Sequence, residues 1–471
     1  MAYGVVENFA GGVDRSRPRY ALPPGTLWSG INGHLSRGGD FEKRLAFVEY
    51  ASLPAGTFGL AATVSGLVTF GSAAVPAGMP STITYQRLQH PTVASASMAK
   101  LRARELFNGK LYAISEFDTG DIRHYYDATN ITDWNGGANK PVGYGSIART
   151  WGRKLYSPIG SIVWFSQTDT PTTFDTGSSG SGFQNMNSQN AGSDAVTAMA
   201  AYQQKLAIFA RRVVMIWDMQ TDPAQNAPVQ TIPNLGTRAP RSCVSFFDLD
   251  TFFLSDTGIR SLRARQGTSI AGVNDVGTPI DPELLAYLET LTDSQVSGAI
   301  GEVEPGDGRF WLAVGQRIYV FSYFPSKKIS AWSWYEPGFE VSDIAVLNGR
   351  IYCRAADKVY IYGGTDGETY DSCRVTCALP FIDGGKPGTY KQLTGIDIGA
   401  TGEWAAKVLV NPNDENDFVD LGTISGCTFL DPNTAGVGHV THMAPEFINE
   451  AAGPASISRF AIYNDAAETS V

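Results

Sequence analysis

The stretch Gly308–Tyr335, GRFWLAVGQRIYVFSYFPSKKISAWSWY, decides the fold of this chain. Its apolar and aromatic residues fall into three short segments, which are separated by turns at Gly315 and Pro325. Aromatic and β-branched residues favour strands, and glycine and proline favour the tight turns between them. We therefore predict three antiparallel strands. So small a sheet cannot bury both of its faces alone, and we expect the unit to recur along the chain.

The same pattern of turn, apolar strand, short turn and second apolar strand returns across residues 57–365. The first strand of each unit is marked by an apolar residue, and these residues stand 41 to 58 positions apart: Leu67, Leu111, Leu155, Leu206, Phe252, Phe310 and Ile351. The second strand of the last six units begins at Ile122, Ile162, Val213, Ile259, Ile318 and Val359. Repeats of roughly 40 to 50 residues with three or four short strands are typical of a β-propeller. We count seven blades, or six if the weak first unit is not a blade.

Three parts of the chain follow from this repeat. Residues 1–50 are predicted to be an extended N-terminal arm with a closing strand, residues 51–365 the β-propeller, and residues 366–471 a β-sandwich-like domain. Prolines 18, 23 and 24 argue against regular secondary structure in the arm. The last unit lacks an outer strand after Gly364, and Glu42–Tyr50 alternates well enough to supply it. The widest gap between units holds Pro282 and several leucines, which predict a short helix. The fold class is all-β, and the competing architecture is an immunoglobulin-like array.

Composition excludes several classes of protein. The net charge is −10, so a broad basic field for sequence-specific nucleic-acid binding is absent. Five cysteines do not make a disulfide framework, and the first residues do not resemble a signal peptide. No run of 18 apolar residues occurs, so we expect no membrane-spanning segment and synthesis in a cytoplasm.

The N-terminal arm is basic, unlike the rest of the chain. Its candidate partner-docking residues are Arg15, Arg17, Arg19, Arg37, Lys43 and Arg44. One interpretation is a solvated segment that lies on the core. The other is an arm that docks onto another subunit or an acidic surface.

Two motifs resemble catalytic or metal sites. FDTG, the string around the catalytic aspartate of pepsin-like proteases, occurs at Phe117–Gly120 and Phe174–Gly177, and Asp256 begins a third DTG. An aspartic dyad needs one carboxylate from each of two lobes, whereas the FDTG copies lie one repeat apart. Asp-Thr-Gly is also ordinary turn chemistry, so we predict turns here and no catalytic residue.

Cys373 and Cys377 with His439 and His442 offer four zinc-type ligands. A spacing of four along a strand separates two side chains by about 13 Å, which is too far for one tetrahedral ion. We therefore predict buried thiols, surface histidines, no metal and no cofactor. The polar stretch Gly177–Gly192 is predicted to be a long mobile loop on one propeller face.

The opening of the chain resembles the tail nozzle (tail tubular, or hub) proteins of short-tailed bacteriophages. The likeness lies in NFAGG (8–12), PPG (23–25), Asn32 and GDFEKR (39–44). Later blades of that family are similar to FFLSDTGIRSL (252–262), GTPIDPEL (277–284) and residues 309–333. The likeness covers most of the chain, but its motifs are structural. Prolines 23 and 24 stand where members of the family usually prolong a helix.

The resemblance implies a structural virion protein of the tail and no enzyme. Such proteins form a homohexameric ring below the portal and adaptor, retain the packaged genome and conduct double-stranded DNA during ejection without reading its sequence. They also carry tail fibres or spikes. An acidic lumen would repel phosphates and let DNA slide. The alternatives are a propeller-based receptor- or glycan-binding tail component, in which Trp311, Trp332 and Trp334 stack on sugars, and a hydrolase.

Overall fold

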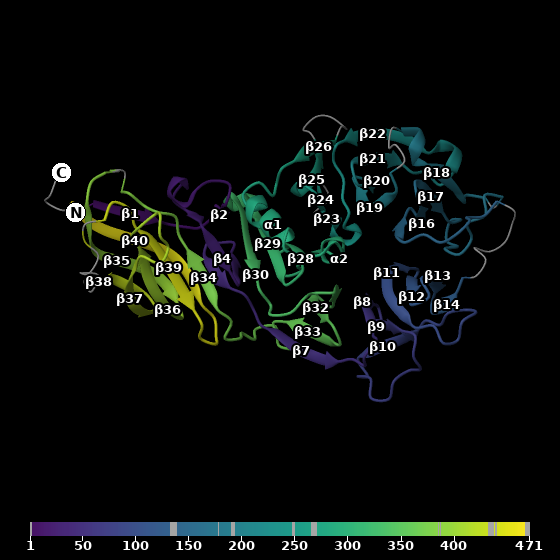
Figure 1. The fold of residues 1–471 in the computed structure, drawn as a ribbon, viewed down its shortest axis with the longest axis horizontal. Helices are drawn as coiled ribbons and strands as arrows, with labels where there is room; N and C mark the ends of the chain where they lie inside the picture. Colours follow the sequence, from purple (N-terminus) through teal and green to yellow (C-terminus); the bar gives the residue numbers. More distant parts are fainter. Residues whose placement is uncertain are drawn as a thin grey trace.

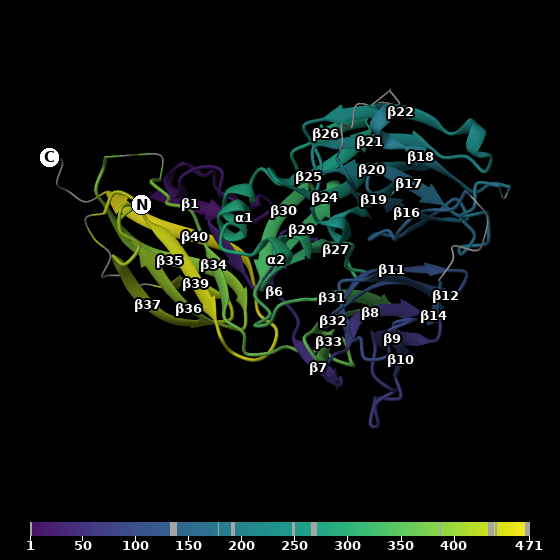
Figure 2. The same ribbon diagram turned by 45° about the vertical axis from the view of Figure 1, so that its right-hand side comes forward.

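The computed structural model describes residues 2–131, 139–177, 179–189, 194–246, 250–264, 271–384, 386, 388–431, 438 and 440–466. Within these residues the chain forms a ring of seven small sheets and a two-sheet sandwich beside it (Figure 1). The all-β fold, with a propeller and a sandwich, is confirmed. Figure 2 shows the same two lobes after a turn of 45° about the vertical axis.

The blades follow one another along the chain. Blade 1 consists of β8 (Phe58–Thr63), β9 (Gly66–Gly71) and β10 (Ile83–Arg87). Blade 2 consists of β11 (Met98–Phe107), β12 (Lys110–Phe117), β13 (Ile122–Tyr126) and β14 (Thr129–Asn130). Blade 3 consists of β15 (Arg149–Trp151), β16 (Lys154–Ile159), β17 (Ile162–Phe165) and β18 (Gly182–Asn185). Blade 4 consists of β19 (Val196–Tyr202), β20 (Lys205–Ala210), β21 (Val213–Asp218) and β22 (Ala227–Pro233).

The later blades complete the ring. Blade 5 consists of β23 (Val244–Phe246), β24 (Asp250–Ser255), β25 (Gly258–Ala264) and β26 (Ala271–Asn274). Blade 6 consists of β27 (Ile300–Val303), β28 (Phe310–Val314), β29 (Arg317–Phe324) and β30 (Ile329–Tyr335). Blade 7 consists of β31 (Asp343–Leu347), β32 (Arg350–Ala355) and β33 (Lys358–Tyr362) together with β7 (Phe47–Ser52). The first strands of neighbouring blades contact each other all the way round, and β31 contacts β8 to close the circle.

The sequence repeat matches the middle of each blade. Every landmark residue lies in the second strand of its blade, from Leu67 in β9 to Ile351 in β32. The predicted partner strands are the third strands, from β13 to β33. In blade 6, β28, β29 and β30 confirm the three strands predicted between Gly308 and Tyr335. These strands are hydrophobic because both faces of a blade are covered by neighbouring blades.

The N-terminal side closes the ring, as predicted, but with a shifted strand. The strand β7 pairs antiparallel with β33, with Phe47 opposite Tyr362 and Ser52 opposite Lys358. The first part of the predicted closing strand instead forms β6 (Phe41–Lys43) in the sandwich. The alternating apolar and polar residues of 42–50 therefore belong to two different sheets. The chain crosses from the sandwich to the propeller between β6 and β7.

The sandwich is made from both ends of the chain. One sheet has the order β38-β35-β40-β6-β5, with β1 also paired to β40, and the other runs β4-β34-β39-β36-β37. Its N-terminal strands are β1 (Ala2–Val6), β4 (Ser29–Ile31), β5 (Gly33–Leu35) and β6; the short pair β2 (Gly12–Val13) and β3 (Thr26–Leu27) lies nearby. Its C-terminal strands are β34 (Val375–Ala378), β35 (Lys391–Thr401), β36 (Glu403–Leu409), β37 (Phe418–Ser425), β38 (Thr428–Asp431), β39 (Ala444–Asn449) and β40 (Ser456–Ala466).

Residues 1–50 thus form regular strands where irregular backbone was expected. The three prolines lie between β2 and β3, around the 3₁₀ turn η1 (Arg19–Ala21), where they interrupt no strand. Gly12 lets this segment approach blade 6 closely: its φ is +58°, and a Cβ there would lie 2.7 Å from the Cβ of Ala331. The segment is therefore part of the core and does not lie loosely over it.

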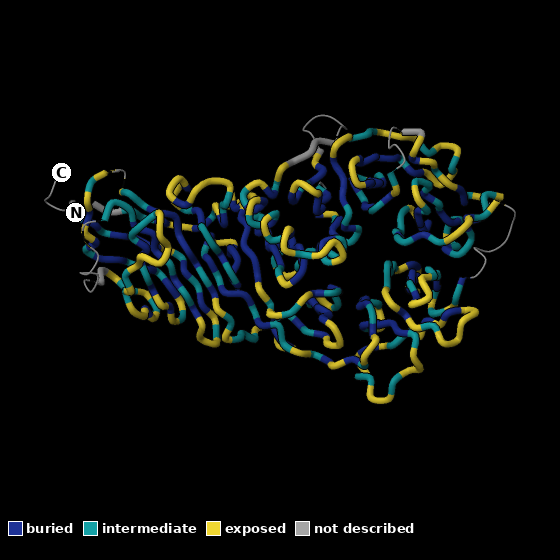
Figure 3. The backbone as a smooth tube through the Cα atoms, viewed as in Figure 1, coloured by how far each residue is buried: buried dark blue, intermediate teal, exposed yellow. Residues whose placement is uncertain are grey.

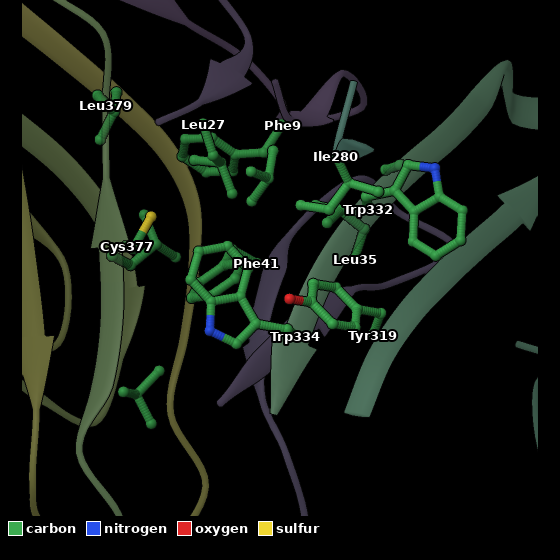
Figure 4. Packing of buried hydrophobic residues seen from close by; sticks show 14 of the residues in the cluster. Phe9, Leu27, Leu35, Phe41, Ile280, Tyr319, Trp332, Trp334, Cys377 and Leu379 are labelled. Carbon is green, nitrogen blue, oxygen red and sulfur yellow. The ribbon is translucent and has the colours of Figure 1, made fainter. Parts of the chain in front are cut away.

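One sheet and one hydrophobic core join the two lobes. The strand β4 pairs with β30 of blade 6 through Ile31 and Trp334 and with β34 on its other side, so blade 6 continues into the sandwich as a nine-stranded sheet. Figure 4 shows Phe9, Leu27 and Phe41 of the N-terminal segment in one core with Trp332 and Trp334 of blade 6 and with Cys377 and Leu379. Figure 3 shows buried backbone along these strands and exposed backbone at the turns.

Two helices stand between blades 5 and 6. The helix α1 (Asp281–Leu288) confirms the predicted short helix, and its Leu284 side chain is buried in the core that joins the lobes. The helix α2 (Asp293–Ser297) begins with a capping box, in which Thr292 and Gln295 satisfy each other's backbone N–H groups. No helix of the described residues is long and apolar enough to cross a membrane.

Candidate functional site

A buried charge cluster lies on the propeller axis around Asp343. This residue begins β31 and is only 2% exposed. Its Oδ1 accepts from Arg104 of blade 2 at 2.9 Å and from Arg241, ahead of blade 5, at 2.7 Å. Its Oδ2 accepts from Arg354 of blade 7 at 2.8 Å. One buried carboxylate therefore connects three segments that lie around the axis.

The three arginines also bind backbone carbonyl groups. Arg104 donates to the carbonyl of Ile344, Arg241 to those of Ser342 and Gly298, and Arg354 to that of Ala356. Burial alone would raise the pKa of Asp343, but the three guanidinium charges outweigh burial and lower it. The carboxylate is therefore ionised at neutral pH, and the cluster carries more positive than negative charge.

Two of the predicted docking cations are buried inside the sandwich. Arg19 donates from Nε to the carbonyl of Leu379 at 3.0 Å. Lys43 donates from Nζ to the carbonyl of Ala451 at 2.7 Å and to Asn449 at 3.2 Å. Both side chains hold the N-terminal strands to the C-terminal ones.

Two more cations bind the propeller. Arg15 forms an ion pair with Glu283 of α1 at 3.0 Å and lies over the ring of Trp28, 3.7 Å from its centroid. Arg37 forms an ion pair with Asp307 ahead of β28 at 2.9 Å. These contacts fasten the N-terminal segment to blade 6 and its helix.

Arg44 and Arg17 complete the predicted set. Arg44 is 2% exposed; it donates to Asn32, to the carbonyl of Leu45 and to Asp371, the last at 3.0 Å. Arg17 is exposed, and its side chain forms no hydrogen bond or ion pair with a described residue. Five of the six cations thus make contacts within the chain, and docking onto another subunit stays a prediction.

Replacing Arg44 with alanine is expected to lower the free energy of unfolding by about 2 kcal/mol, because hydrogen bonds to a charged group contribute roughly 1.5–3 kcal/mol. The matched change Arg17→Ala removes the same charge from an exposed site and is expected to stay within about 0.5 kcal/mol of the wild type. Urea denaturation followed by tryptophan fluorescence measures both. Equal losses in the two variants would contradict the anchoring role of Arg44.

The aspartate motifs are turns, as predicted. Asp118 accepts the backbone N–H of Ser97, and Asp175 accepts that of Gly177. Asp256 forms ion pairs with Arg211 and Arg238 at the surface. The three carboxylates belong to blades 2, 3 and 5, so the structure does not assemble a shared-proton pair from them.

The cysteine and histidine motif does not form a metal cluster in the described residues. Burial raises the pKa of the Cys373 thiol to about 12, and Cys377 is fully buried in the core that joins the lobes. His442 is half-buried next to Thr441, and His439 lies outside the described residues.

The stretch Gly177–Gly192 was expected to be a long loop, and this is wrong for its described middle part. Gly182–Asn185 is β18, the outer strand of blade 3, and the ring of Phe183 packs on Trp164. The 3₁₀ turn η2 (Met186–Gln189) follows, with Met186 buried. An outer strand needs backbone partners and few apolar side chains, so its polar composition concealed it.

The axis cluster was missed by sequence reasoning, although a signal for it existed. Lys100, Arg102 and Arg104 alternate within the strand β11, and all three line cavities on the axis. Alternating cations on a strand that runs along the axis of a propeller predict a charged centre. Their acidic partner Asp343 lies 239 positions away from Arg104, and no local pattern announces it.

Comparison with known proteins finds structural similarity at low sequence identity and low TM-score, from which no property of this chain follows. No protein-family model matches the sequence, and no curated protein matches it. Similar solved structures include BamB from Moraxella catarrhalis, at 11% identity over 68% of this chain and 98% of that chain, with a TM-score of 0.36. The WD40 domain of Neurospora crassa Pan2 is 10% identical over 70% and 98% of the two chains, with a TM-score of 0.38. The WD40 β-propeller domain of Doa1 is 10% identical over 68% and 97%, with a TM-score of 0.36.

Proposed function

We propose that this propeller protein is a structural subunit of a short phage tail, forming the nozzle or hub ring through which DNA leaves the virion. The observation that carries the proposal is the way the N-terminal segment joins the two lobes. Residues 8–44 hold the likeness to nozzle proteins and also supply β2 to β6, which lie against blade 6 and within the sandwich. The segment therefore has a structural use that suits a wall-forming subunit.

Rigidity supports this role. A ring subunit under load from packaged DNA needs lobes that do not hinge, and here a nine-stranded sheet runs through both of them. Its core includes Trp332 and Trp334, which are at most 2% exposed. A sheet and a core that are continuous between lobes resist relative motion better than a linker does.

Charge supports passage of DNA without sequence-specific binding. The chain has a net charge of −10, and the turn between β36 and β37 is acidic and exposed at Asp414, Glu415 and Asp417. Acidic surfaces repel the phosphate backbone, so DNA would slide past. We propose a homohexamer that binds portal and adaptor rings and carries fibres or spikes, with no enzymatic activity and no cofactor.

Mass photometry of the purified protein, alone and with candidate portal and adaptor rings, tests the proposal. We expect particles of six times the subunit mass in at least one of these mixtures, with sixfold symmetry by cryo-electron microscopy. A persistent monomer in every mixture would count against the ring. The alternative is a receptor- or glycan-binding tail component. Its tryptophan candidates Trp311, Trp332 and Trp334 are buried, so binding of a glycan array by the monomer would have to use other residues.

A further inference from the structure

A cavity of about 390 Å³ lies on the propeller axis beside the Asp343 cluster. Its wall comes from the first strands of six blades, β11, β15, β19, β23, β27 and β31, or from residues directly ahead of them. A second cavity, of about 230 Å³, contains Asp343 and Arg354 in its wall. Arg241 lines both cavities, so the cluster stands between them on the axis.

The wall of the larger cavity is positively charged. It contains four arginines and two glutamates: Arg102, Arg104, Arg149, Arg241, Glu105 and Glu302. The wall itself thus has two more positive than negative side chains (four minus two), and the carboxylates of Asp343 and Glu116 bind three of the arginines from outside the wall. Cations gathered in a concave site with low-dielectric walls attract small anions strongly.

Three of the four arginines already bind a carboxylate. Arg104 and Arg241 share Asp343, and Arg102 donates to Glu116 at 2.7 Å. The guanidinium of Arg149 forms no hydrogen bond or ion pair with a described residue. This half-buried side chain therefore has donors available to a ligand.

The two glutamates do not neutralise Arg149 by direct contact. Glu105 accepts the backbone N–H of Thr150 at 2.7 Å, and Glu302 accepts that of Val303 at 3.1 Å. Burial raises the pKa of both carboxyl groups, although Arg149 and Arg104 act in the opposite direction. Both acids therefore take up a proton more readily than exposed glutamates, which makes the cavity more positive as the pH falls.

We propose that the larger axial cavity binds a small anion, a phosphate or a polycarboxylate, through Arg149. A guanidinium offers a planar set of donors that matches carboxylate and phosphate oxygens. Small-molecule sites usually have volumes of about 300–1,000 Å³, and this cavity falls within that range. Arg102, which is paired with Glu116, is a further cation of the wall, and Arg104 and Arg241 of the Asp343 cluster line the same cavity.

Isothermal titration calorimetry of the full chain with inorganic phosphate and, separately, with tricarballylate tests the proposal at constant ionic strength in chloride. We expect at least one of the two anions to bind, and its affinity to fall at least tenfold in Arg149→Gln. Arg153→Gln is the matched control: it removes an arginine from the turn after the same strand, where Arg153 is exposed and paired with Asp169. The affinity of the Arg153→Gln variant for the anion is expected to stay within about twofold of the wild-type affinity.

A second variant keeps the test decisive if Arg149→Gln fails to fold. Glu302→Gln removes a competing negative charge and is expected to tighten anion binding several-fold. Absence of binding by the wild type, equal affinity in Arg149→Gln, or unchanged or weaker binding in Glu302→Gln would overturn the proposal. The result does not depend on ring assembly, because each subunit contains the whole cavity wall.

Discussion

Replacing Asp343 with asparagine is expected to lower the free energy of unfolding by about 3–5 kcal/mol, the usual cost of leaving a buried charge without its partner. The asparagine side chain has nearly the same shape as that of aspartate, so the packing around it is preserved. The variant therefore measures the effect of removing the negative charge. The three guanidinium groups of Arg104, Arg241 and Arg354 would then lie close together without the carboxylate charge that they share. Since domains are stable by only about 5–15 kcal/mol, this loss is large.

The contribution of Asp343 to the free energy of unfolding decreases at low pH. The pKa of Asp343 is lower in the folded chain than its ordinary value of 3.8. Its contribution is therefore fully present above that value and is lost as the pH falls through the folded-state pKa. The difference in stability between wild type and Asp343→Asn is expected to be constant near neutral pH and to narrow only in strongly acidic solution.

Urea denaturation monitored by near-ultraviolet circular dichroism measures the effect. Asp256→Asn is the matched control, because Asp256 also has two arginine partners but is 41% exposed. Exposed ion pairs contribute about 0–1 kcal/mol to stability, so the free energy of unfolding of this variant should stay close to that of the wild type. The axial cluster would have no special role if Asp343→Asn were no less stable than Asp256→Asn.

The sequence predicts the middle of each blade well and its edges poorly, for a physical reason. Second and third strands are covered on both faces and carry apolar residues such as Leu206 and Val213, which stand out in the sequence. First strands face the axis, and β11 carries charged residues there, which interrupt its apolar pattern. Outer strands such as β14 and β18 need only backbone hydrogen bonds, so their side chains vary.

The joining of the lobes could not be predicted locally. The strand β4 has three residues, and its partners are Trp334 in blade 6 and Thr376 in the sandwich, each more than 300 positions away. Short strands whose partners are distant leave no periodic signal. The axial cluster was hidden for the same reason, because its charges come from blades 2 and 7 and from the segment ahead of blade 5, which meet at the axis but are far apart in sequence. The basic character of the N-terminal segment was visible, but its contacts were not.

Separating the C-terminal domain from the N-terminal segment is expected to abolish its folding. A fragment of residues 366–471 lacks β1, β4, β5 and β6 and exposes the core faces they cover. The missing side chains include five that are completely buried: Phe9, Val13, Leu27, Leu35 and Phe41. Burial of each contributes about 1.5–3 kcal/mol, so together they match the whole stability of an ordinary domain.

Co-expression of two fragments tests this expectation. Residues 1–365 should capture residues 366–471 as a soluble complex with one cooperative unfolding transition, because all strand partners are present. Residues 51–365 should not, since they lack the N-terminal strands of the sandwich and most of β7, which pairs with β33. Cooperative folding of residues 366–471 alone, or equal capture by both partners, would show that the sandwich is independent. We expect dependence, because N-terminal strands pair directly with C-terminal strands in both sheets of the sandwich, and removing either set leaves unpaired edges beside a hydrophobic core.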